Sequence, residues 1–531
     1  MALSAVSLSG LCGESALAQS TDWWQDAVFY EVFVRSFADS TEGPLAGDGV
    51  GDLRGLIERL DTLNDGDPTT TTDLGVTALW LMPICQSPSY HGYDVVDYRA
   101  IDEEYGTTQD FLDLIEAAHA RGMRVIVDTV INHSSSQHPW FLDALDADSP
   151  MHDWFVWSEQ PREVAWDSTV WHAQRPEGPI ENGLFYYGLF WSGMPDLNLR
   201  NADTTAAVHD FSRFWLTDMQ ADGFRLDAVK YLIEDWPQIE HTDETIAWLA
   251  EYRRAMKDAN PEAFLIGEVW ADSTQVARYI PDALDAAFEF DLAFAIVEGV
   301  RDGDAGRIAR TIEAVQETYP PGRYATFLAN HDMPRVMTTL REGSAREGSA
   351  REGSADEAEA LTKAKLCATI QLTLPGIPFV YYGEEIGMTG AKPDPDLRTP
   401  MQWTEDAATA GFTTGTPWRE PHTDTATVNV RAQTDDPASL LATYRRLIRL
   451  RQEHPDLWRG SFEVLETSDP AVLAYMLESP SKRLVVLVNC SDTAVVGVRL
   501  GRSETESGEG GEPLPWASLP AWGSAIITTP R

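Results

Sequence analysis

Short runs of apolar, β-branched and aromatic residues alternate along this chain with longer amphipathic stretches. The short runs predict eight strands, at residues 28–37, 76–84, 124–133, 223–230, 264–270, 287–294, 324–332 and 376–387. Stretches such as 108–122 and 210–223 have apolar residues at three- and four-residue spacing and a glycine near the end, so they predict helices. Eight successive strand–helix units predict an α/β fold, the (β/α)8 or TIM barrel.

Two intervals break this repeating pattern and predict additional domains. The interval after the third strand is too long for a simple loop and is rich in aromatic residues, which predicts a small inserted domain at 134–199. After the last amphipathic helix (438–454), short alternating runs separated by turns predict a C-terminal antiparallel β-sandwich domain at 456–531. The barrel domain then comprises residues 22–133 and 200–455.

The N-terminus and one internal repeat are expected to lie outside the packed core. Residues 1–21 include Ala16-Leu17-Ala18 before Gln19, which resembles a signal-peptide cleavage site but lacks the positively charged start. We therefore expect a secreted or periplasmic protein, and a cytoplasmic location stays open. Three copies of Arg-Glu-Gly-Ser-Ala at 341–355 contain too little apolar surface to pack, so they predict an exposed flexible loop.

Charge excludes several kinds of partner. Acidic residues outnumber basic ones by 84 to 40, so the formal net charge is −44. This charge repels nucleic acid and anionic membrane surfaces, and no apolar run reaches the roughly 18 residues of a membrane-spanning helix. The basic residues are almost all arginine, a composition that resembles halophilic proteins; an ordinary acidic protein is the alternative. We expect a monomer.

The four cysteines are too widely spaced to form a disulfide framework or a CxxC metal site. We expect Cys85, Cys367 and Cys490 to be buried thiols.

Several predicted strands end in acidic residues. Asp128, Asp227, Glu268 and Asp332 follow apolar runs on the third, fourth, fifth and seventh strands. Any one of them alone could be a salt-bridge partner or a helix cap. Together they should meet at the carboxyl rim of the barrel, where glycoside cleavage needs one carboxyl to protonate the leaving oxygen and another to attack the anomeric carbon or activate water.

Four motifs, at 128–133 (DTVINH), 223–230 (GFRLDAVK), 267–270 (GEVW) and 328–332 (LANHD), resemble in order and spacing the signature regions of the α-amylase family, glycoside hydrolase family 13. The resemblance implies that Asp227 is the nucleophile, that Glu268 is the general acid/base, and that Asp332 binds sugar hydroxyls and helps to distort the ring. It also implies retention of configuration, with the two carboxyls about 5–5.5 Å apart. We expect a raised pKa for Glu268 and a low one for Asp227, which lies two residues from Arg225.

The same resemblance implies residues that hold one glucose unit: hydrogen-bonding histidines, a stacking tyrosine and a pair in the eighth-strand loop, namely His133 and His331, Tyr93, and Asp394 and Arg398. Lys230 stands where α-amylases have lysine and oligo-1,6-glucosidases have asparagine, whereas Tyr231 replaces a histidine that many α-amylases have. The segment 194–198 (MPDLN) resembles a group intermediate between oligo-1,6-glucosidases and neopullulanases.

Hydrolysis of α-1,4 bonds in starch, maltodextrins or maltooligosaccharides is therefore expected, with an α-glucan as the only partner. The alternatives are an exo-acting α-glucosidase or a cyclomaltodextrinase or neopullulanase type of enzyme. A more distant alternative is a non-catalytic carbohydrate-binding relative, but such proteins have lost catalytic acids.

The loop after the first strand combines closely spaced aspartates and glycines, a pattern suited to oxygen ligation of a hard cation. It resembles the calcium loop of oligo-1,6-glucosidases, which implies Ca²⁺ held by Asp48, Asp52, the Val50 carbonyl and Asp39. Extra residues separate Asp39 from Asp48, and an ordinary Asp/Gly turn is the alternative. The region of Asn132 and Asp128 is a second candidate for a metal, and we leave it open.

Overall fold

The computed structural model describes residues 22–159, 170–173, 184–342, 357–501 and 517–530. The expectations for the N-terminal tail (1–21) and for residues 343–355 of the repeat lie outside these residues. The inserted domain is described except for 160–169 and 174–183.

Eight parallel strands form a closed barrel, as the hydrophobic pattern predicted. Their spatial order is β1-β13-β12-β11-β10-β9-β5-β2. The strands are β1 (Phe29–Val32), β2 (Ala78–Leu81), β5 (Arg124–Thr129), β9 (Gly223–Leu226), β10 (Phe264–Gly267), β11 (Ala286–Phe288), β12 (Tyr324–Thr326) and β13 (Ile377–Tyr381). Each strand lies within or next to one of the eight predicted apolar runs.

The observed strands are shorter than the predicted runs, because each run continues past the sheet into a loop or helix. Residues 34–37 form helix α1 (Val34–Phe37), and α8 (Phe290–Asp302) begins inside the sixth predicted run. The predicted helix at 210–223 is in fact α5 (Ala202–Thr217), which begins earlier because the Asn201 side chain accepts hydrogen bonds from the N–H groups of Asp203 and Thr204. Because the strands end before the predicted runs do, the polar residues at the ends of these runs lie beyond the sheet, at the rim of the barrel.

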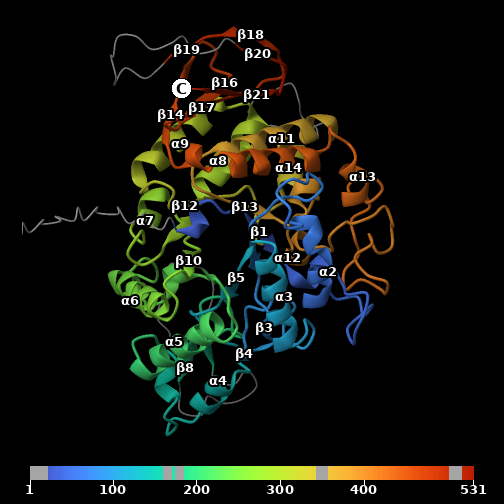
Figure 1. Cartoon of the computed structure of the whole chain (residues 1–531). Helices are drawn as coiled ribbons and strands as arrows, with labels where there is room; N and C mark the ends of the chain where they lie inside the picture. Colours follow the sequence, from blue (N-terminus) through green and yellow to red (C-terminus); the bar gives the residue numbers. More distant parts are fainter. Residues whose placement is uncertain (1–21, 160–169, 174–183, 343–356, 502–516, 531) are drawn as a thin grey trace, which may run out of the picture.

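Helices surround the barrel (Figure 1). The longer ones are α2 (Leu53–Leu63), α3 (Thr108–Ala120), α5, α6 (Asp243–Ala259), α8, α9 (Ala305–Thr318), α11 (Glu357–Thr373) and α14 (Leu440–Glu453). Shorter helices are α7 (Ser273–Ala277), α10 (Val336–Arg341), α12 (Asp394–Leu397), α13 (Val430–Thr434) and α15 (Pro455–Trp458). Single 3-10 turns occur at Trp23–Gln25, His152–Trp154, Val229–Tyr231 and Glu384–Ile386.

Aromatic side chains fill the inside of the barrel. Phe29 stacks on Phe379 with ring centroids 4.3 Å apart, and Phe264, Phe288 and Trp80 pack in the same cluster. A larger apolar cluster lies between the strands and the helix ring. Because both layers are closely packed, the loops at the carboxyl ends start from rigid positions.

The inserted segment follows β5 and precedes α5. It contains α4 (Pro139–Ala144) and a three-stranded sheet of β6 (Trp157–Ser158), β8 (Phe185–Tyr187) and β7 (Trp171–Ala173). A two-stranded sheet of β3 (Cys85–Gln86) and β4 (Asp97–Ile101) precedes it. In Figure 1 this region lies at the lower end of the molecule.

An antiparallel sheet of order β14-β16-β17-β21 forms the C-terminal domain, as predicted, and lies at the opposite end in Figure 1. The strands of this domain are β14 (Ser461–Val464), β15 (Glu466–Thr467), β16 (Val472–Glu478), β17 (Lys482–Asn489), β18 (Val495–Val498), β19 (Leu500–Gly501), β20 (Ala517–Leu519) and β21 (Ser524–Pro530). A separate apolar cluster that includes Val472, Val485 and Leu487 supports it.

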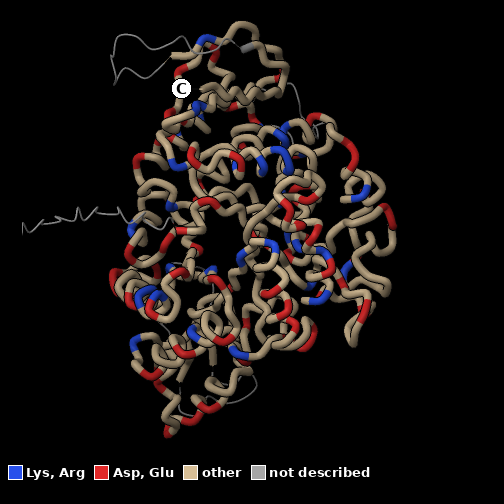
Figure 2. The backbone as a smooth tube through the Cα atoms, viewed as in Figure 1, with Lys and Arg blue, Asp and Glu red and all other residues tan. Residues whose placement is uncertain are grey.

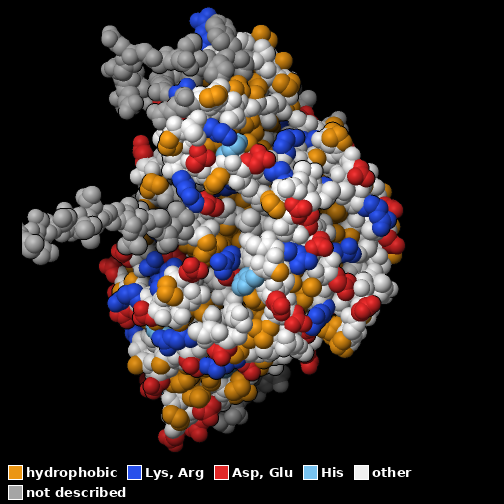
Figure 3. All heavy atoms as spheres, in the orientation of Figure 1, with side chains coloured by type: hydrophobic (Ala, Val, Ile, Leu, Met, Phe, Trp, Pro, Cys, Tyr) orange, Lys and Arg blue, Asp and Glu red, His pale blue; other side chains and the backbone are white. Residues whose placement is uncertain are grey.

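Asp and Glu positions are distributed along all parts of the described chain (Figure 2), and on the face in Figure 3 acidic and basic side chains are interspersed. None of the described helices is long and apolar enough to cross a membrane. Cys85, Cys367 and Cys490 are buried free thiols, as expected.

Candidate active site

A cavity of about 250 Å³ adjoins the ends of the barrel strands. Seven of the site residues predicted from sequence line it: Tyr93, His133, Asp227, Glu268, Asp332, Asp394 and Arg398. The other lining residues are His91, Phe190, Trp191, Met194 and Ala228. Polar groups gathered with aromatic walls are typical of a small-molecule or carbohydrate site.

Arg225 lies behind this cavity and joins three carboxylates. Its Nη1 donates to Asp227 Oδ1 at 2.8 Å and to both oxygens of Asp128 at 2.9 Å, while Nη2 donates to Glu268 Oε2 at 2.9 Å. The guanidinium is only 1% exposed. One buried cation therefore bonds both the Asp227 and the Glu268 carboxylates, and a retaining mechanism needs two carboxyls near one another.

The turn after β9 contributes a further contact to Glu268. Ala228, directly after Asp227, has φ of 51°, a left-handed conformation that is unfavourable for a residue with a Cβ. This turn directs the Ala228 N–H to Glu268 Oε2 at 3.2 Å. The strained turn thus links the two acidic side chains from adjacent strands.

Burial raises the pKa of Glu268, and Arg225 opposes that rise. The raised pKa agrees with our expectation. The pKa of Asp227 is also raised by burial, with Arg225 again opposing, so the expectation of a low pKa for Asp227 is wrong. The physical reason is that burial of the Asp227 carboxylate, with repulsion from Asp332, outweighs the effect of Arg225, whose charge is shared among three carboxylates.

Asp332 has the low pKa instead. Its Oδ1 accepts from Arg398 Nη2 at 2.8 Å, and its Oδ2 lies 3.0 Å from His331 Nε2. Burial would raise the pKa of Asp332, but His331 and Arg398 hold it well below its usual range. Asp332 is therefore a permanent anion at the cavity.

Glu31, which the sequence analysis missed, supports His331 from inside the barrel. Its Oε1 lies 2.6 Å from His331 Nδ1, and both side chains are buried. Burial would lower the pKa of His331, but Asp332 and Glu31 outweigh it and raise the pKa to about 9. The sequence did contain a signal for Glu31, namely a single acidic residue within an apolar strand. An unpaired buried carboxylate is costly, so such a residue implies a partner.

Replacing Glu31 with Gln is expected to shift the alkaline limit of stability and activity to lower pH. Because the pKa of His331 is about 9 when folded and about 6.5 when unfolded, its pairing stabilises the fold fully below about pH 6.5 and is lost as pH rises through about 9. The contribution is roughly 3 kcal/mol. Melting temperature and kcat measured from neutral to alkaline pH test this; identical alkaline limits in wild type and Glu31→Gln would contradict it.

Tyr93 and His133 complete the inner wall of the cavity. The Tyr93 hydroxyl lies 2.7 Å from His331 Nε2 and 3.1 Å from Asp128 Oδ2, so its ring is fixed. Burial lowers the pKa of His133 to about 4, which leaves the imidazole neutral. Its Nε2 is buried and has no hydrogen-bond partner within the described parts of the chain. That nitrogen can bond a sugar hydroxyl.

Exposed aromatic rings line the cavity or follow closely in sequence a residue that lines it. Phe190 and Trp191, which line it, are 47% and 50% exposed, and Trp270 is 40% exposed beside the β10 end. Lys230 does not line the cavity; its Nζ donates to the Trp270 carbonyl at 2.8 Å and pairs with Glu240 at 2.9 Å. Lys230 therefore supports the Trp270 side of the rim.

Hydrogen bonds within the predicted calcium loop engage its aspartates. Asp39 accepts from the N–H groups of Gly47 and Gly49, each at 2.9 Å. Asp52 caps α2 by accepting from Gly55 N at 2.8 Å, and Asp48 accepts from Val50 N at 2.8 Å. Within the described ranges, no three His, Cys, Asp or Glu side chains form a group that could hold a metal ion. Calcium binding at this loop stays a prediction.

The second candidate region has its own protein partners. Asp128 is bonded to Arg225, and Asn132 Nδ2 donates to Asp196 Oδ2 at 3.0 Å.

A model of the α-amylase catalytic domain matches residues 31–460. The chain belongs to the α-amylase family, glycoside hydrolase family 13. It is 38% identical over 474 residues to alpha-amylase 3 of Dictyoglomus thermophilum, covering 88% of this chain and 85% of that relative. It is 36% identical over 500 residues to the trehalose synthase/amylase of Mycolicibacterium smegmatis, covering 87% and 82%.

A crystal structure of the α-amylase from H. orenii matches with a TM-score of 0.79 at 36% identity, covering 95% of this chain and 99% of that one. As a member of the α-amylase family, this chain is a glycoside hydrolase of α-glucosidic bonds. The names of its relatives include both α-amylases and trehalose synthases, so family membership does not fix the substrate.

Proposed function

We propose that this enzyme is a retaining α-amylase that cleaves α-1,4 bonds in starch, maltodextrins and maltooligosaccharides. The observation that carries the proposal is the single Arg225 guanidinium that joins Asp227 and Glu268 at a cavity also lined by the anionic Asp332. This arrangement supplies a nucleophile, a proton donor and a fixed negative charge around one sugar.

In the first step, an Asp227 oxygen attacks the anomeric carbon while Glu268 gives its proton to the leaving glycosidic oxygen, which breaks the glycosidic bond. Burial favours a protonated Glu268 at the start. In the second step, Glu268 takes a proton from water, whose oxygen attacks the anomeric carbon and releases the Asp227 carboxylate. Two inversions restore the original configuration.

Asp332 supports both steps by binding sugar hydroxyls and stabilising the positive charge that develops on the ring. Its low pKa keeps the anion available.

Exposed rings on more than one part of the rim support an endo mode. Phe190 and Trp191 come from the inserted segment, whereas Trp270 follows β10. Aromatic faces bind the apolar faces of sugar rings, so rings at separate places can hold glucose units on both sides of the cleaved bond. The similarity to two α-amylases supports the same assignment.

A time course with soluble starch, maltotriose, pullulan and maltose tests the proposal. We expect rapid loss of starch viscosity and short oligosaccharides as first products. Glucose released while long chains persist would indicate an exo-acting α-glucosidase. A second candidate function is that of a trehalose synthase, which the 36% identity to a trehalose synthase/amylase favours. Conversion of maltose to trehalose would indicate this function. A salt series in the same assay tests whether the net charge of −44 requires screening, as in a halophilic enzyme.

Two variants test whether the exposed aromatic rings bind long chains. Trp191→Ala is expected to raise KM for starch more than for maltotriose, since only long chains reach all the rings. Leu142→Ala is the matched control, because Leu142 is 55% exposed in the same inserted segment but does not line the cavity.

We also propose calcium binding at residues 39–52, on the sequence resemblance. Adding Ca²⁺ after EDTA treatment should raise the melting temperature of the wild type but not of Asp48→Ala. Asp48 is exposed, so its loss perturbs little else. When the free Ca²⁺ concentration is about 100 times the Kd, binding stabilises the fold by about 2.7 kcal/mol. Equal melting with EDTA and with Ca²⁺ would refute calcium binding and leave the glycosidase proposal intact.

A further inference from the structure

In the segment 397–399, the backbone carbonyl of each residue accepts a hydrogen bond from a side chain elsewhere in the barrel domain. The Leu397 carbonyl accepts from Arg335 Nε at 2.9 Å and from the Tyr381 hydroxyl at 3.2 Å. Arg335 also donates from Nη1 to the Tyr382 carbonyl at 2.7 Å, and its guanidinium lies over the Tyr381 ring, 4.3 Å from the centroid. One buried arginine therefore ties this segment to the end of β13.

The next two carbonyls are held by different side chains. The Ser36 hydroxyl, from α1, donates to the Arg398 carbonyl at 2.5 Å. The Tyr382 hydroxyl donates to the Thr399 carbonyl at 2.7 Å. Ser36 and Tyr382 are both fully buried. We call Ser36, Arg335, Tyr381 and Tyr382 the carbonyl clamp.

The clamp surrounds the one side chain of the segment that reaches the site. Arg398 donates from Nε to the His331 carbonyl at 3.0 Å and from Nη2 to Asp332 Oδ1 at 2.8 Å. Connecting segments usually satisfy their carbonyls with water at the surface. Four protein donors on three consecutive carbonyls instead fix the Arg398 backbone from both sides.

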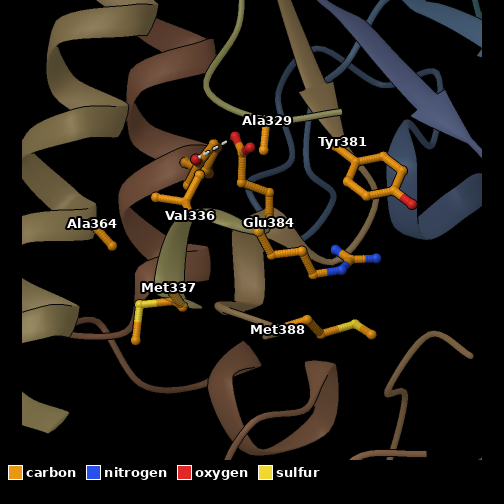
Figure 4. A pocket seen from close by; sticks show the side chains of 9 residues that line it. Ala329, Val336, Met337, Ala364, Tyr381, Glu384 and Met388 are labelled. Carbon is orange, nitrogen blue, oxygen red and sulfur yellow. Dashed lines mark hydrogen bonds between the residues drawn. The ribbon is translucent and has the colours of Figure 1, made fainter. Parts of the chain in front are cut away.

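Close packing beside the clamp leaves little room for the segment to move. The adjoining cavity, which Tyr381 and Glu384 border in Figure 4, has a volume of only about 10 Å³. That is room for about one water molecule. On its far side Glu384 accepts from the Tyr444 hydroxyl at 2.8 Å, so this wall of the cavity is also fixed.

We propose that the four residues of the carbonyl clamp are positioning residues, which set Arg398 and, through it, the Asp332 carboxylate for the reaction. The inference rests on the proposed role of Asp332. Its physical basis is that a displacement of about 1 Å can cost about 100-fold in rate, even when the displaced group is remote from the bond that breaks. A rigid backbone under Arg398 is the means to prevent such a displacement.

Ser36→Ala and Tyr382→Phe each remove one clamp hydroxyl with little change of shape. The double variant is expected to lower kcat by roughly 10- to 100-fold, with KM changed little, because Asp332 acts mainly on the transition state. Tyr444→Phe is the matched control: it removes a buried hydroxyl on the other side of the small cavity that contacts Glu384 and not residues 397–399. Its kcat should stay within about twofold of the wild type.

A double-mutant cycle separates positioning from a purely structural role. In an Asp332→Asn background the clamp variant should cause no further fall in kcat, since the carboxylate that the clamp positions is already absent. α-Maltosyl fluoride is the substrate, because fluoride leaves without a proton and keeps the residual rates measurable. Melting curves of each variant confirm that the compared proteins are folded.

Two results would overturn the inference. One is a folded double clamp variant with wild-type kcat. The other is an equal loss from the clamp variant in the wild-type and Asp332→Asn backgrounds. If Asp332→Asn itself kept full activity, the proposed function would fail instead, so the two failures are distinguishable.

Discussion

Replacing Asp227 with Asn is expected to lower kcat on starch by at least about 10⁴-fold, because the amide cannot form the covalent glycosyl intermediate. Replacing Glu268 with Gln should lower kcat by about 10²- to 10⁴-fold, since it removes the proton donor and the base for water. Steady-state hydrolysis of starch measures both. Both substitutions preserve side-chain shape.

The two roles can be told apart with an activated substrate. The Glu268→Gln variant should recover its first step on α-maltosyl fluoride, whose leaving group needs no proton, and azide should accelerate its second step because azide needs no general base. The Asp227→Asn variant should gain nothing from either change. Glu313→Gln, an exposed glutamate on α9, is the control. If Glu268→Gln hydrolysed starch at the wild-type rate, the mechanism would be wrong.

Removal of the Arg225 guanidinium is expected to have the largest effect on stability. In Arg225→Leu, the Asp128, Asp227 and Glu268 carboxylates lose their shared cation while they stay buried. Breaking a buried ion pair from one side typically costs about 3–5 kcal/mol. The unfolding transition in urea should therefore move to a lower concentration in this variant, and most activity should be lost with it.

The pH dependence of this loss has a definite sign. Arg225 opposes the burial that raises the pKa of Asp227 and Glu268. Without it both pKa values rise further, so the ionised nucleophile should be lost at a higher pH than in the wild type. Because the folded variant then binds protons more readily than the unfolded chain, its loss of stability should be largest at neutral and higher pH and should shrink as pH falls through the raised pKa values. Arg225→Lys should recover part of the stability but little activity, because one ammonium cannot bridge two carboxylates as a planar guanidinium does. A lysine variant with full activity would show that bridging is unimportant.

The sequence was sufficient to place the barrel and most of the cavity wall. Each apolar run correctly predicted a strand, because a parallel strand that is covered on both faces must be apolar throughout. The acids after those runs were expected at the rim because all strands of a parallel barrel end on the same side. Tyr93, His133, Asp394 and Arg398 were reached through motif resemblance, and all four line the cavity.

Other features depended on contacts between distant parts of the chain. Glu31 and His331 are 300 positions apart, so no local pattern could pair them. The sequence also did not indicate the direction of the Asp227 pKa shift, because that shift comes from burial in the folded protein, which outweighs the effect of Arg225. The predicted strands were too long, since an apolar run does not show where a chain leaves the sheet.

By itself, then, the sequence determined the order of strands and helices, the acidic balance and the acids Asp227, Glu268 and Asp332, because periodicity and motif are local properties. Only the tertiary structure decided which charges meet: Arg225 with three carboxylates, His331 between Glu31 and Asp332, and the clamp under Arg398. The physical reason is that electrostatic interactions and pKa values depend on distance and burial in space, and separation along the chain specifies neither.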